Sequence, residues 1–423
     1  MTPAIARPAA SRVRWTICGL LFAATVIAYV DRGVLAYLEK TLEGIIGWDK
    51  EQYSYMTAAF QAAYAIGLVG AGWLADRLGT RRGFALAITL WSVAAMAPAA
   101  ASSVFTFAVA MFLLGLGEAA NFPACIKTVA EWFPRSERAL ATGLFNSGAN
   151  IGAIAVPVAV PFLYEALGWR GAFVATGALG FVWLAFWLGL YEKPEHHKRI
   201  SAAELAHVQS DPPEVLARVP WARIIPHRET WAFALAKMLT DPIWWFYIFW
   251  IPRYLQGPPF NLSLTASRTP VVAIYVISCV GGIAGGWLSS AMLKSGKSVN
   301  AARKTAMLIC ALLVVPVALV PRVSSVWAVV ALVGLAAAAH QGWSANVFTL
   351  ASDMFPKAAV ASVVGFGGMI GSAAGVLFQL LAGRLSYVLL YAIAGSAYLI
   401  AILIVHLLTP RMAPAKLGGK GAY

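Results

Sequence analysis

Charged residues are scarce in this chain of 423 residues, because Asp, Glu, Lys and Arg together make up only 12% of it. Soluble globular proteins carry about 25% charged residues, so the composition argues against a water-soluble domain. Hydrophobic residues make up 60% of the chain, and its mean hydropathy is +0.73. We therefore expect an integral membrane protein that crosses the bilayer several times.

Cysteine is also rare, and the common catalytic motifs are missing. The four cysteines are Cys18, Cys125, Cys279 and Cys310. They have no paired spacing, so we expect packing residues and neither a disulfide framework nor a metal site. The chain has no Walker loop, dinucleotide fingerprint or nucleophile elbow, and the His196-His197 pair has no further ligand spacing. We therefore expect no enzyme activity, no metal and no cofactor.

Apolar stretches of about 20 residues, the length needed to cross a bilayer, recur along the chain. We predict twelve membrane-spanning helices, at about residues 16–38, 53–75, 84–101, 104–127, 139–161, 171–190, 231–252, 269–292, 305–321, 326–350, 359–381 and 387–408. Because twelve is even, both termini should lie on one side. The polar, basic start runs directly into the first span, so we expect no cleaved signal peptide.

The positive charges are unevenly distributed between the two sides of the predicted spans. The net charge is +14; 22 Lys and Arg lie on the side that holds both termini, and 7 lie on the other. This bias follows the positive-inside rule, so we expect both termini in the cytoplasm. The excess charge then reflects membrane topology, and we expect no nucleic-acid partner.

The longest polar segment divides the twelve predicted spans into six and six. We expect a cytoplasmic N-terminal segment at 1–15, a six-helix bundle at 16–190, a central cytoplasmic loop at 191–230, a second six-helix bundle at 231–408 and a cytoplasmic tail at 409–423.

The two halves repeat weakly in sequence. Phe133-Pro134 corresponds to Phe355-Pro356 at an offset of 222, and GWL at 72–74 corresponds to GWL at 286–288 at an offset of 214. Two matches at similar offsets indicate a duplicated unit. We therefore expect an all-α membrane protein with two pseudo-symmetric halves and a site between them near the midplane.

Six charged residues lie within or at the end of the predicted spans. A charge at membrane depth costs about 2.5–3.5 kcal/mol on insertion scales, so it tends to face a water-filled path or a partner. Both signs occur, and the acids can titrate. This pattern indicates a proton-coupled carrier for a charged solute. The six residues are Asp31, Arg32, Glu118, Lys127, Lys237 and Asp241.

The segment GWLADRLGTRRG at 72–83 follows the second predicted span. It resembles the loop 2–3 signature of major facilitator superfamily transporters, G-x-L-a-D-r-x-G-r-r/k-x. The resemblance implies the major facilitator fold, with Asp76, Arg77 and Arg81 in a cytoplasmic gate. Ordinary positive-inside loop charges would explain the arginines, but not the ordered Gly and Asp.

Longer strings resemble the anion:cation symporter branch of that superfamily. They are AYVDRG at 28–33, GLGEAANFPA at 115–124 and FNSG at 145–148. The segments 231–255 and 340–356 resemble the hexuronate transporters of the branch. The resemblance implies a symporter in the inner membrane that imports a sugar acid, such as galacturonate or glucuronate, with protons by alternating access.

The same residues suggest how protons and an anion could be coupled. Burial favours a protonated acid and a nearby cation favours the carboxylate, so Asp31 and Glu118 could load and release a proton. The resemblance gives the matching acids this role. Arg32 is the candidate for the substrate carboxylate, because guanidinium binds carboxylate bidentately. The alternative is a static ion pair of Arg32 with Asp31 or Glu118.

One position departs from the family pattern. Galactonate- and glutamate-type members carry Arg seven residues before the Glu of span four, where this chain has Met111. Lys237 could replace that cation. It precedes Asp241 by four residues, so both lie on one helical face, and a structural pair is the alternative to a substrate role. Lys127 should reach the interface.

Polar and aromatic residues near the midplane could bind sugar hydroxyls and the C–H face of a sugar. Packing is the alternative for each of them, and Trp250 should belong to an interfacial aromatic belt. The candidates are Tyr29, Gln61, Tyr64, Asn146, Asn150, Trp244, Trp245, Tyr247, His340, Gln341, Trp343, Ser344 and Asn346.

The expected partners are a small organic anion, the proton as coupling ion and membrane lipid, and we expect a monomer. Three alternatives remain at this stage. The same fold could carry another organic anion, such as an aldonate, a dicarboxylate or an aromatic acid. The chain could be a non-transporting sensor of such solutes, or a membrane enzyme.

Overall fold

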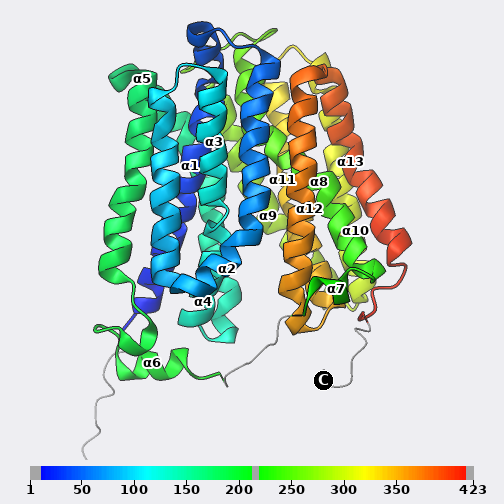
Figure 1. Ribbon diagram of the computed structural model, residues 1–423. Coiled ribbons are helices and arrows are strands. Elements are labelled where there is room, and N and C mark those ends of the chain that lie inside the picture. The colour runs from blue at the N-terminus through cyan, green and yellow to red at the C-terminus, as the bar shows by residue number, and fades with distance from the viewer. Residues whose placement is uncertain (1–10, 212–218, 416–423) are drawn as a thin grey trace, which may run out of the picture.

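The computed structural model describes residues 11–211 and 219–415 of the chain, and these form helices joined by short connections (Figure 1). The helices are α1 Val13–Ile46, α2 Lys50–Met96, η1 Ala97–Ala100, α3 Val104–Glu118, α4 Asn121–Trp132, α5 Arg135–Leu190, η2 Pro194–His196, α6 Ala202–Val208, α7 Trp221–Ile224, α8 Arg228–Gln256, α9 Arg268–Lys294, α10 Val299–Val314, η3 Val315–Arg322, α11 Val326–Met354, α12 Lys357–Arg384 and α13 Tyr387–Leu408.

Two of the long helices each contain two predicted spans. The backbone of α2 leaves the helical conformation at Gly79, where φ is 72°, and that of α5 does so at Gly168, where φ is 70°. Glycine adopts a positive φ without the steric penalty of a Cβ, so the chain can reverse there between one crossing and the next. When both helices are counted as two crossings, the described helices make up the twelve predicted spans.

Some of the twelve crossings are interrupted. A count of helices by length and composition also leaves out two crossings. α3 and α4 form one crossing that is broken at Ala119 and Ala120, and α10 continues as η3. By length and composition, nine described helices are apolar enough to cross a membrane. That count takes α5 once and omits the first part of α2 and all of α8. In α8 the charged Lys237 and Asp241 and several Trp and Tyr residues lower the mean hydropathy.

The helices pack as two halves with equivalent pairings. In the first half (α1–α5), α1 packs on α5 and α2 on α3; in the second half (α8–α13), α8 packs on α12 and α9 on α11. Between the halves, α2 packs on α12 and α9 packs on α5. These two contacts are equivalent, because α9 corresponds to the first part of α2 and α12 to the first part of α5. The first helices of the two halves, α1 and α8, also pack on each other. Figure 1 shows the two groups of helices side by side.

The repeated Phe-Pro dipeptide adopts the same backbone conformation in both halves. Phe133 directly follows α4 with φ −128° and ψ 134°, and Phe355 directly follows α11 with φ −125° and ψ 146°. Pro134 and Pro356 then directly precede α5 and α12 as their N-cap residues, with φ near −63°. A proline fixes φ and lacks the N–H that the first turn of a helix leaves unpaired. The predicted repeat is therefore present in structure as well as in sequence.

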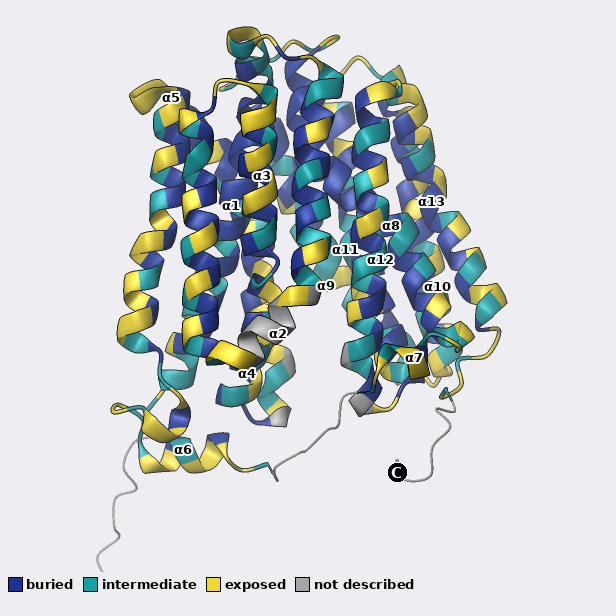
Figure 2. Cartoon of the chain, in the orientation of Figure 1, coloured by how far each residue is buried: buried dark blue, intermediate teal, exposed yellow. Residues whose placement is uncertain are grey.

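Large apolar side chains cover the outside of the bundle. Figure 2 shows exposed residues along the outer faces of α5 and α13, and Phe162 and Leu407 are 70% and 64% exposed. An exposed apolar surface of this extent marks contact with lipid. The chain is therefore a multi-pass membrane protein.

The segment between the halves contains η2, α6 and α7. Glu204 of α6 accepts hydrogen bonds from the Ser11 hydroxyl at 2.5 Å and from the Val13 and Arg14 amides at 3.1 Å. Burial acts to raise the pKa of Glu204, but these hydrogen bonds outweigh it and the pKa is lowered. The predicted boundaries 1–15, 191–230 and 409–423 fall partly outside the described residues and stay predictions.

The halves are joined mainly at one end of the bundle. We call the end that holds residues 11 and 415 the terminal end, and the opposite end the far end. Hydrogen bonds and ion pairs between described residues of the two halves lie between the far end and the middle of the bundle. Arg77, Lys127 and Asp211 have further interactions and are excepted. The deepest of the hydrogen bonds between the halves joins Gln341 and Asn150. The described part of the chain is therefore closed at the far end.

Candidate functional site

A buried ion pair joins α1 and α3 inside the first half. Arg32 donates to Glu118 Oε2 through Nη2 at 2.5 Å and through Nε at 2.9 Å. The two side chains are only 3% and 0% exposed. Of the two partners that the sequence left open for Arg32, the structure therefore selects Glu118. Removal of either partner would leave an uncompensated buried charge, which is strongly destabilising.

The position of Glu118 follows from local backbone features. It is the last residue of α3, directly before the break at Ala119. A Cβ at Gly115, one turn earlier, would collide with the Phe60 carbonyl oxygen of α2. The absence of that atom lets α3 approach α2 closely, and this approach brings Glu118 into reach of α1.

Four aromatic rings surround the Arg32 guanidinium. Its central carbon lies 4.2 Å from the Tyr29 ring centre, 5.1 Å from Trp245, 5.4 Å from Phe60 and 5.7 Å from Tyr64. Such cation–π contacts stabilise a desolvated cation. Tyr29, Tyr64 and Trp245 are predicted site residues, and Trp245 comes from the second half. The ion pair is thus enclosed by aromatic side chains from both halves.

Phe60 is a member of this enclosure that the sequence analysis did not select. It lies one turn before Tyr64 on α2, and the two rings stack at 5.9 Å. It also contacts Trp245 and Phe249 of α8. The i, i+4 spacing from Tyr64 was the available signal, but an apolar residue at that spacing is more often packing.

Asp31 is buried and forms no ion pair with another described residue. It is 3% exposed, and neither carboxylate oxygen has a hydrogen-bond partner among the described residues. Asp31 and Arg32 are consecutive on α1, so their side chains leave the helix in different directions. The Asp31–Arg32 pair considered from sequence is therefore not formed in the described structure. An ionised carboxylate in such a place is costly, and a bound proton removes that cost.

The second half contains its own ion pair. Lys237 Nζ lies 2.8 Å from Asp241 Oδ2, one turn apart on α8. The side chains are 9% and 22% exposed, so the carboxylate is the more accessible of the two. Lys237 also lies 4.7 Å from the centre of the Phe348 ring. The structural pair expected as one alternative is present, and a role in substrate binding stays a prediction.

Two predicted sugar contacts lie within the packing of the second half. His340 Nδ1 lies 2.6 Å from the Tyr398 hydroxyl, and its ring stacks on Trp244 at 5.1 Å. Trp343 is fully buried and donates its indole N–H to Thr240 at 3.2 Å. In this conformation both side chains bind other residues of their own half, and their predicted contact with a solute is untested.

Amide side chains lie where the halves meet. Gln341 Nε2 donates to Asn150 Oδ1 at 3.2 Å and so joins α11 to α5. Gln61 is fully buried, and neither its amide oxygen nor its nitrogen has a hydrogen-bond partner among the described residues. It packs against Gly375 of α12. Asn146 is exposed and Ser344 is half-buried on the same two helices that Asn150 and Gln341 occupy.

The far end is closed by a charged cluster that the sequence analysis missed. Arg253 of α8 forms ion pairs with Glu39 and Glu43 of α1, and Glu39 also accepts from the Trp48 indole at 3.3 Å. The predicted spans ended at residues 38 and 252, one position short of Glu39 and Arg253. The signal was therefore present as charges at two span ends, but the sequence does not show that they meet.

The prediction that Trp250 belongs to an interfacial belt is wrong. Trp250 is fully buried, and its indole N–H donates to Gln379 Oε1 of α12 at 2.7 Å. Its ring also lies edge-on to Tyr53 of α2 at 5.1 Å. A Trp that can bury its ring and satisfy its N–H inside a helix bundle has no need of the lipid interface.

The predicted gating residues flank the reversal of α2 at Gly79, at the terminal end of the bundle. The Asp76 side chain is outside the described part of the structure, and Arg77 is exposed. Arg81 forms an ion pair with Glu192 at 2.9 Å and donates to the Leu188 carbonyl at 2.5 Å. These contacts join Arg81 to the end of α5 and to the segment that follows it, and neither reaches the second half. A gating role for the three residues is untested.

Most of the chain is similar to known transport proteins. Residues 21–378 match the family model described as "Major Facilitator Superfamily". The "Hexuronate transporter" of Escherichia coli (strain K12) is 32% identical over 382 residues, which cover 88% of each chain. The "Galacturonate transporter" of Dickeya chrysanthemi is 33% identical over 310 residues, which cover 72% of this chain and 89% of the relative.

A third relative and two solved structures extend the comparison. The "Probable galactarate/D-glucarate transporter" of Bacillus subtilis (strain 168) is 29% identical over 389 residues, covering 88% of this chain and 85% of the relative. The crystal structure of a D-xylose-proton symporter superposes with a TM-score of 0.74 at 13% identity, over 94% of this chain and 98% of that one. A bacterial homologue of the lysosomal transporter Spinster gives 0.69 at 15%, over 95% and 96%.

Proposed function

This chain belongs to the major facilitator superfamily, and from that premise we propose that it is a symporter that imports a sugar acid together with protons. The proposed cargo is a hexuronate such as galacturonate or glucuronate. The chain is a transport protein and not an enzyme. Relatives named hexuronate and galacturonate transporters, at 32% and 33% identity, support the cargo.

The observation that carries the proposal is the environment of Arg32. Its guanidinium is buried, has a single carboxylate partner in Glu118 and is enclosed by aromatic rings from both halves. Guanidinium binds a carboxylate through two parallel hydrogen bonds, and aromatic faces suit the C–H side of a sugar ring. A sugar acid presents both groups on one small molecule. Trp245 would contact it from the second half.

Coupling to protons follows from an exchange of partners at Arg32. When the substrate carboxylate takes Arg32, Glu118 is left buried without its cation. Binding a proton removes that charge and its desolvation cost. Asp31, whose carboxylate oxygens already lack hydrogen-bond partners among the described residues, is the second site at which a proton would bind. The substrate anion and a proton would therefore enter together and leave together.

The sugar hydroxyls would be bound by amides and hydroxyls between the halves. Gln61 supports this role most directly, because its buried amide has both a free donor and a free acceptor among the described residues. Asn150 and Gln341 bond each other across the halves, so a solute can replace that bond without leaving either amide unpaired. Asn146 and Ser344 lie nearby on the same helices.

The Lys237–Asp241 pair supports a second candidate cargo, a sugar acid with two carboxylates. Lys237 precedes Trp245 by eight residues on α8, about 12 Å along a helix. A dicarboxylate of six carbons could place one carboxylate at Arg32 and the other at Lys237, displacing Asp241. A relative named galactarate/D-glucarate transporter favours the same alternative.

Transport would proceed by alternating access with both termini in the cytoplasm. The positive-inside rule supports this orientation, so the far end would face outward. The closed cluster of Arg253, Glu39 and Glu43 would then form the outer gate. Asp76, Arg77 and Arg81 would act at the cytoplasmic gate, and the halves would rock about the buried Arg32 site.

Uptake into proteoliposomes tests this function. The purified chain would be given labelled galacturonate or glucuronate, with and without an inward proton gradient. We expect accumulation that requires the gradient. Arg32→Lys should abolish it, because Lys keeps the charge but lacks the bidentate geometry. Arg322→Gln, at the far-end surface, is the matched control and should transport normally.

Each possible result identifies a different function. Gradient-dependent accumulation supports the symporter. Uptake of galactarate but of neither hexuronate would assign the dicarboxylate cargo. Binding without flux in vesicles that contain only this protein would identify a solute sensor and refute transport.

A further inference from the structure

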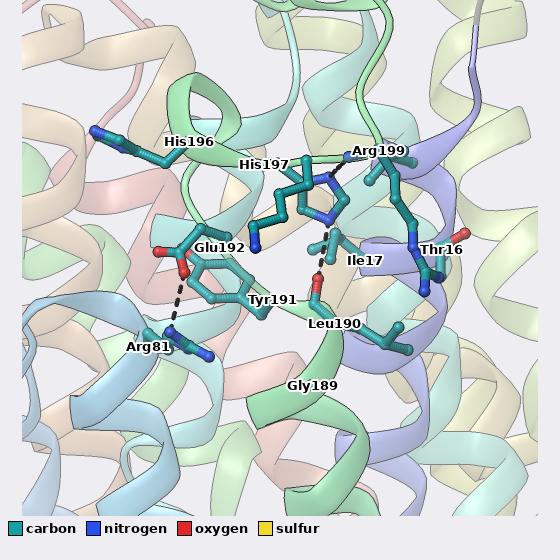
Figure 3. A pocket seen from close by; sticks show the side chains of 12 residues that line it. Thr16, Ile17, Arg81, Gly189, Leu190, Tyr191, Glu192, His196, His197 and Arg199 are labelled. Atoms are coloured by element: carbon teal, nitrogen blue, oxygen red, sulfur yellow. Dashed lines mark hydrogen bonds and ion pairs between the residues drawn. The ribbon is translucent and has the colours of Figure 1, made fainter.

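A polar cavity lies at the terminal end of the first half, away from Arg32. Its volume is about 400 Å³. It is lined by the first turn of α1, by Arg81 of α2 and by the segment that runs from the end of α5 through η2 (Figure 3). All of its lining residues belong to the first half or to the segment after it, so it is separate from the proposed sugar site.

The cavity carries a net positive charge. Figure 3 shows Arg81, paired with Glu192, on one side and Arg199 on the other. Lys198 also lines the cavity. Lys198 and Arg199 are exposed, and neither forms an ion pair with another described residue. Arg81 and Glu192 cancel, so two cations remain for an anionic ligand.

His197 fixes the backbone of the turn that carries the two cations. The Arg199 amide donates to His197 Nδ1 at 3.2 Å, and Nε2 lies 3.1 Å from the Leu190 carbonyl. This pattern assigns the neutral tautomer with hydrogen on Nε2. The ring also lies edge-on to the buried Trp132 at 5.3 Å. The turn bearing Lys198 and Arg199 is thus fixed to the end of α5 before any ligand arrives.

One face of α5 leads from this cavity along the outside of the bundle. Leu190 lines the cavity, and Phe186 and Val182 precede it by four and eight residues, so the three share one helical face. Phe186 and Val182 are 57% and 55% exposed. An acyl chain could follow this apolar face while its headgroup occupies the basic cavity. A small soluble phosphate compound would make no use of it.

We propose that this cavity binds the phosphate of an anionic phospholipid, through Lys198 and Arg199, at the membrane surface beside α1 and α5. Basic pockets at the ends of membrane helices suit such headgroups, and ammonium and guanidinium groups are the usual phosphate ligands. Because Arg81 and the end of α5 line the same cavity, the bound lipid would connect the loop after the second span to the segment between the halves.

Lipid retention by the purified full-length protein tests the site. Native mass spectrometry would count cardiolipin and phosphatidylethanolamine retained during titration in detergent. We expect cardiolipin to bind more tightly, and Lys198→Gln with Arg199→Gln to weaken it by about 30-fold, at about fivefold per cation. The charge-preserving pair Lys198→Arg with Arg199→Lys should retain the lipid.

Matched controls separate this site from general charge effects. The double variant Lys294→Gln with Lys297→Gln removes two exposed cations at the terminal end of the second half and should bind cardiolipin normally. Equal loss in that control, or no loss in the cavity variant, would overturn the proposal. So would displacement of cardiolipin by millimolar inorganic phosphate, which would assign a soluble phosphate ligand. Folding is checked by circular dichroism and elution volume, and no outcome depends on the identity of the transported solute.

Discussion

Replacement of Glu118 by Gln tests the proposed exchange of partners at Arg32. Gln keeps the size of the side chain but resembles a permanently protonated Glu, so Arg32 loses its anionic partner. Glu118 accepts two bonds from Arg32, at 2.5 and 2.9 Å, and both side chains are buried. Loss of one partner from a buried ion pair costs about 3–5 kcal/mol, so the empty variant should unfold at a lower temperature.

The substrate carboxylate should recover part of that energy. In the unmodified protein it must displace Glu118, whereas in Glu118→Gln it meets an unpaired cation. If it recovers about 2 kcal/mol, the affinity rises about 30-fold. Because the substituted residue cannot release a proton, this part of the pH dependence of binding should vanish. Exchange of labelled for unlabelled substrate should continue, but uphill accumulation driven by a proton gradient should stop.

Three assays on the same preparation measure these effects. Equilibrium binding of labelled galacturonate is measured from pH 5 to pH 8, exchange is measured without a gradient, and accumulation is measured with one. Glu195→Gln, an exposed acid in η2, is the matched control. Unchanged gradient-driven accumulation in Glu118→Gln would refute the coupling role. Weaker instead of tighter binding would refute the competition between Glu118 and substrate.

Three further predictions concern other parts of the molecule. Arg253→Gln removes the two ion pairs that Arg253 forms at the far end, with Glu39 and Glu43. A loss of about 3 kcal/mol would favour far-end opening by about 100-fold. Faster thiol labelling of Ser267→Cys, in a variant without the four native cysteines, would show this opening, and unchanged labelling would contradict it. Lys237→Met should weaken galactarate binding more than galacturonate binding. Adding Asp241→Asn should restore stability without restoring galactarate binding. Equal effects on the binding of both ligands in competition assays would argue against a second carboxylate site. The lowered pKa of Glu204 means that its stabilisation is complete above the unfolded value, about 4.3, and is lost as pH falls through the lower folded value. Hydrogen exchange of the amides of residues 13 and 14 should therefore become faster in that acidic range, and Glu204→Gln should remove this pH dependence. The same pH dependence in Glu204→Gln would contradict an electrostatic contact.

Much of the architecture followed from composition and periodicity. Hydropathy predicted the twelve crossings, and the Phe-Pro repeat predicted two equivalent halves. The interruptions were not predicted. Gly79 and Gly168 reverse the chain through a positive φ, and in sequence they look like other glycines. The break after Glu118 occurs among alanines, which favour helix, so packing of α3 against α2 decides it and propensity does not.

The site was predictable where a residue type is costly in lipid. Asp31, Arg32 and Glu118 could be selected because each charge at membrane depth requires an explanation. The partner of Arg32 was left open, because Glu118 lies 86 positions away and only tertiary structure brings it close. The roles of these residues in transport stay predictions.

Residues that are not energetically costly at membrane depth, or that lie outside the predicted spans, were missed or misplaced. Phe60 is apolar in an apolar chain, and nothing local shows that it faces a cation. Glu39 and Arg253 lie just beyond the predicted spans, so neither was among the six charges selected at membrane depth. Trp250 was placed at the interface by composition alone, whereas its hydrogen bond to Gln379 depends on a helix 129 positions away.

Two ion pairs at membrane depth, one in each half, also determine how a membrane voltage would act on the carrier. Arg32 with Glu118 and Lys237 with Asp241 each sum to zero charge, so an electric field exerts no net force on either pair as the halves move. One uncompensated charge that crosses 100 mV changes the free energy by about 2.3 kcal/mol. Of these five side chains, Asp31 is the one left outside a pair. The empty carrier would return with Asp31 either protonated and neutral, or ionised and negatively charged. The protonation state of Asp31 would therefore decide whether that step is sensitive to voltage.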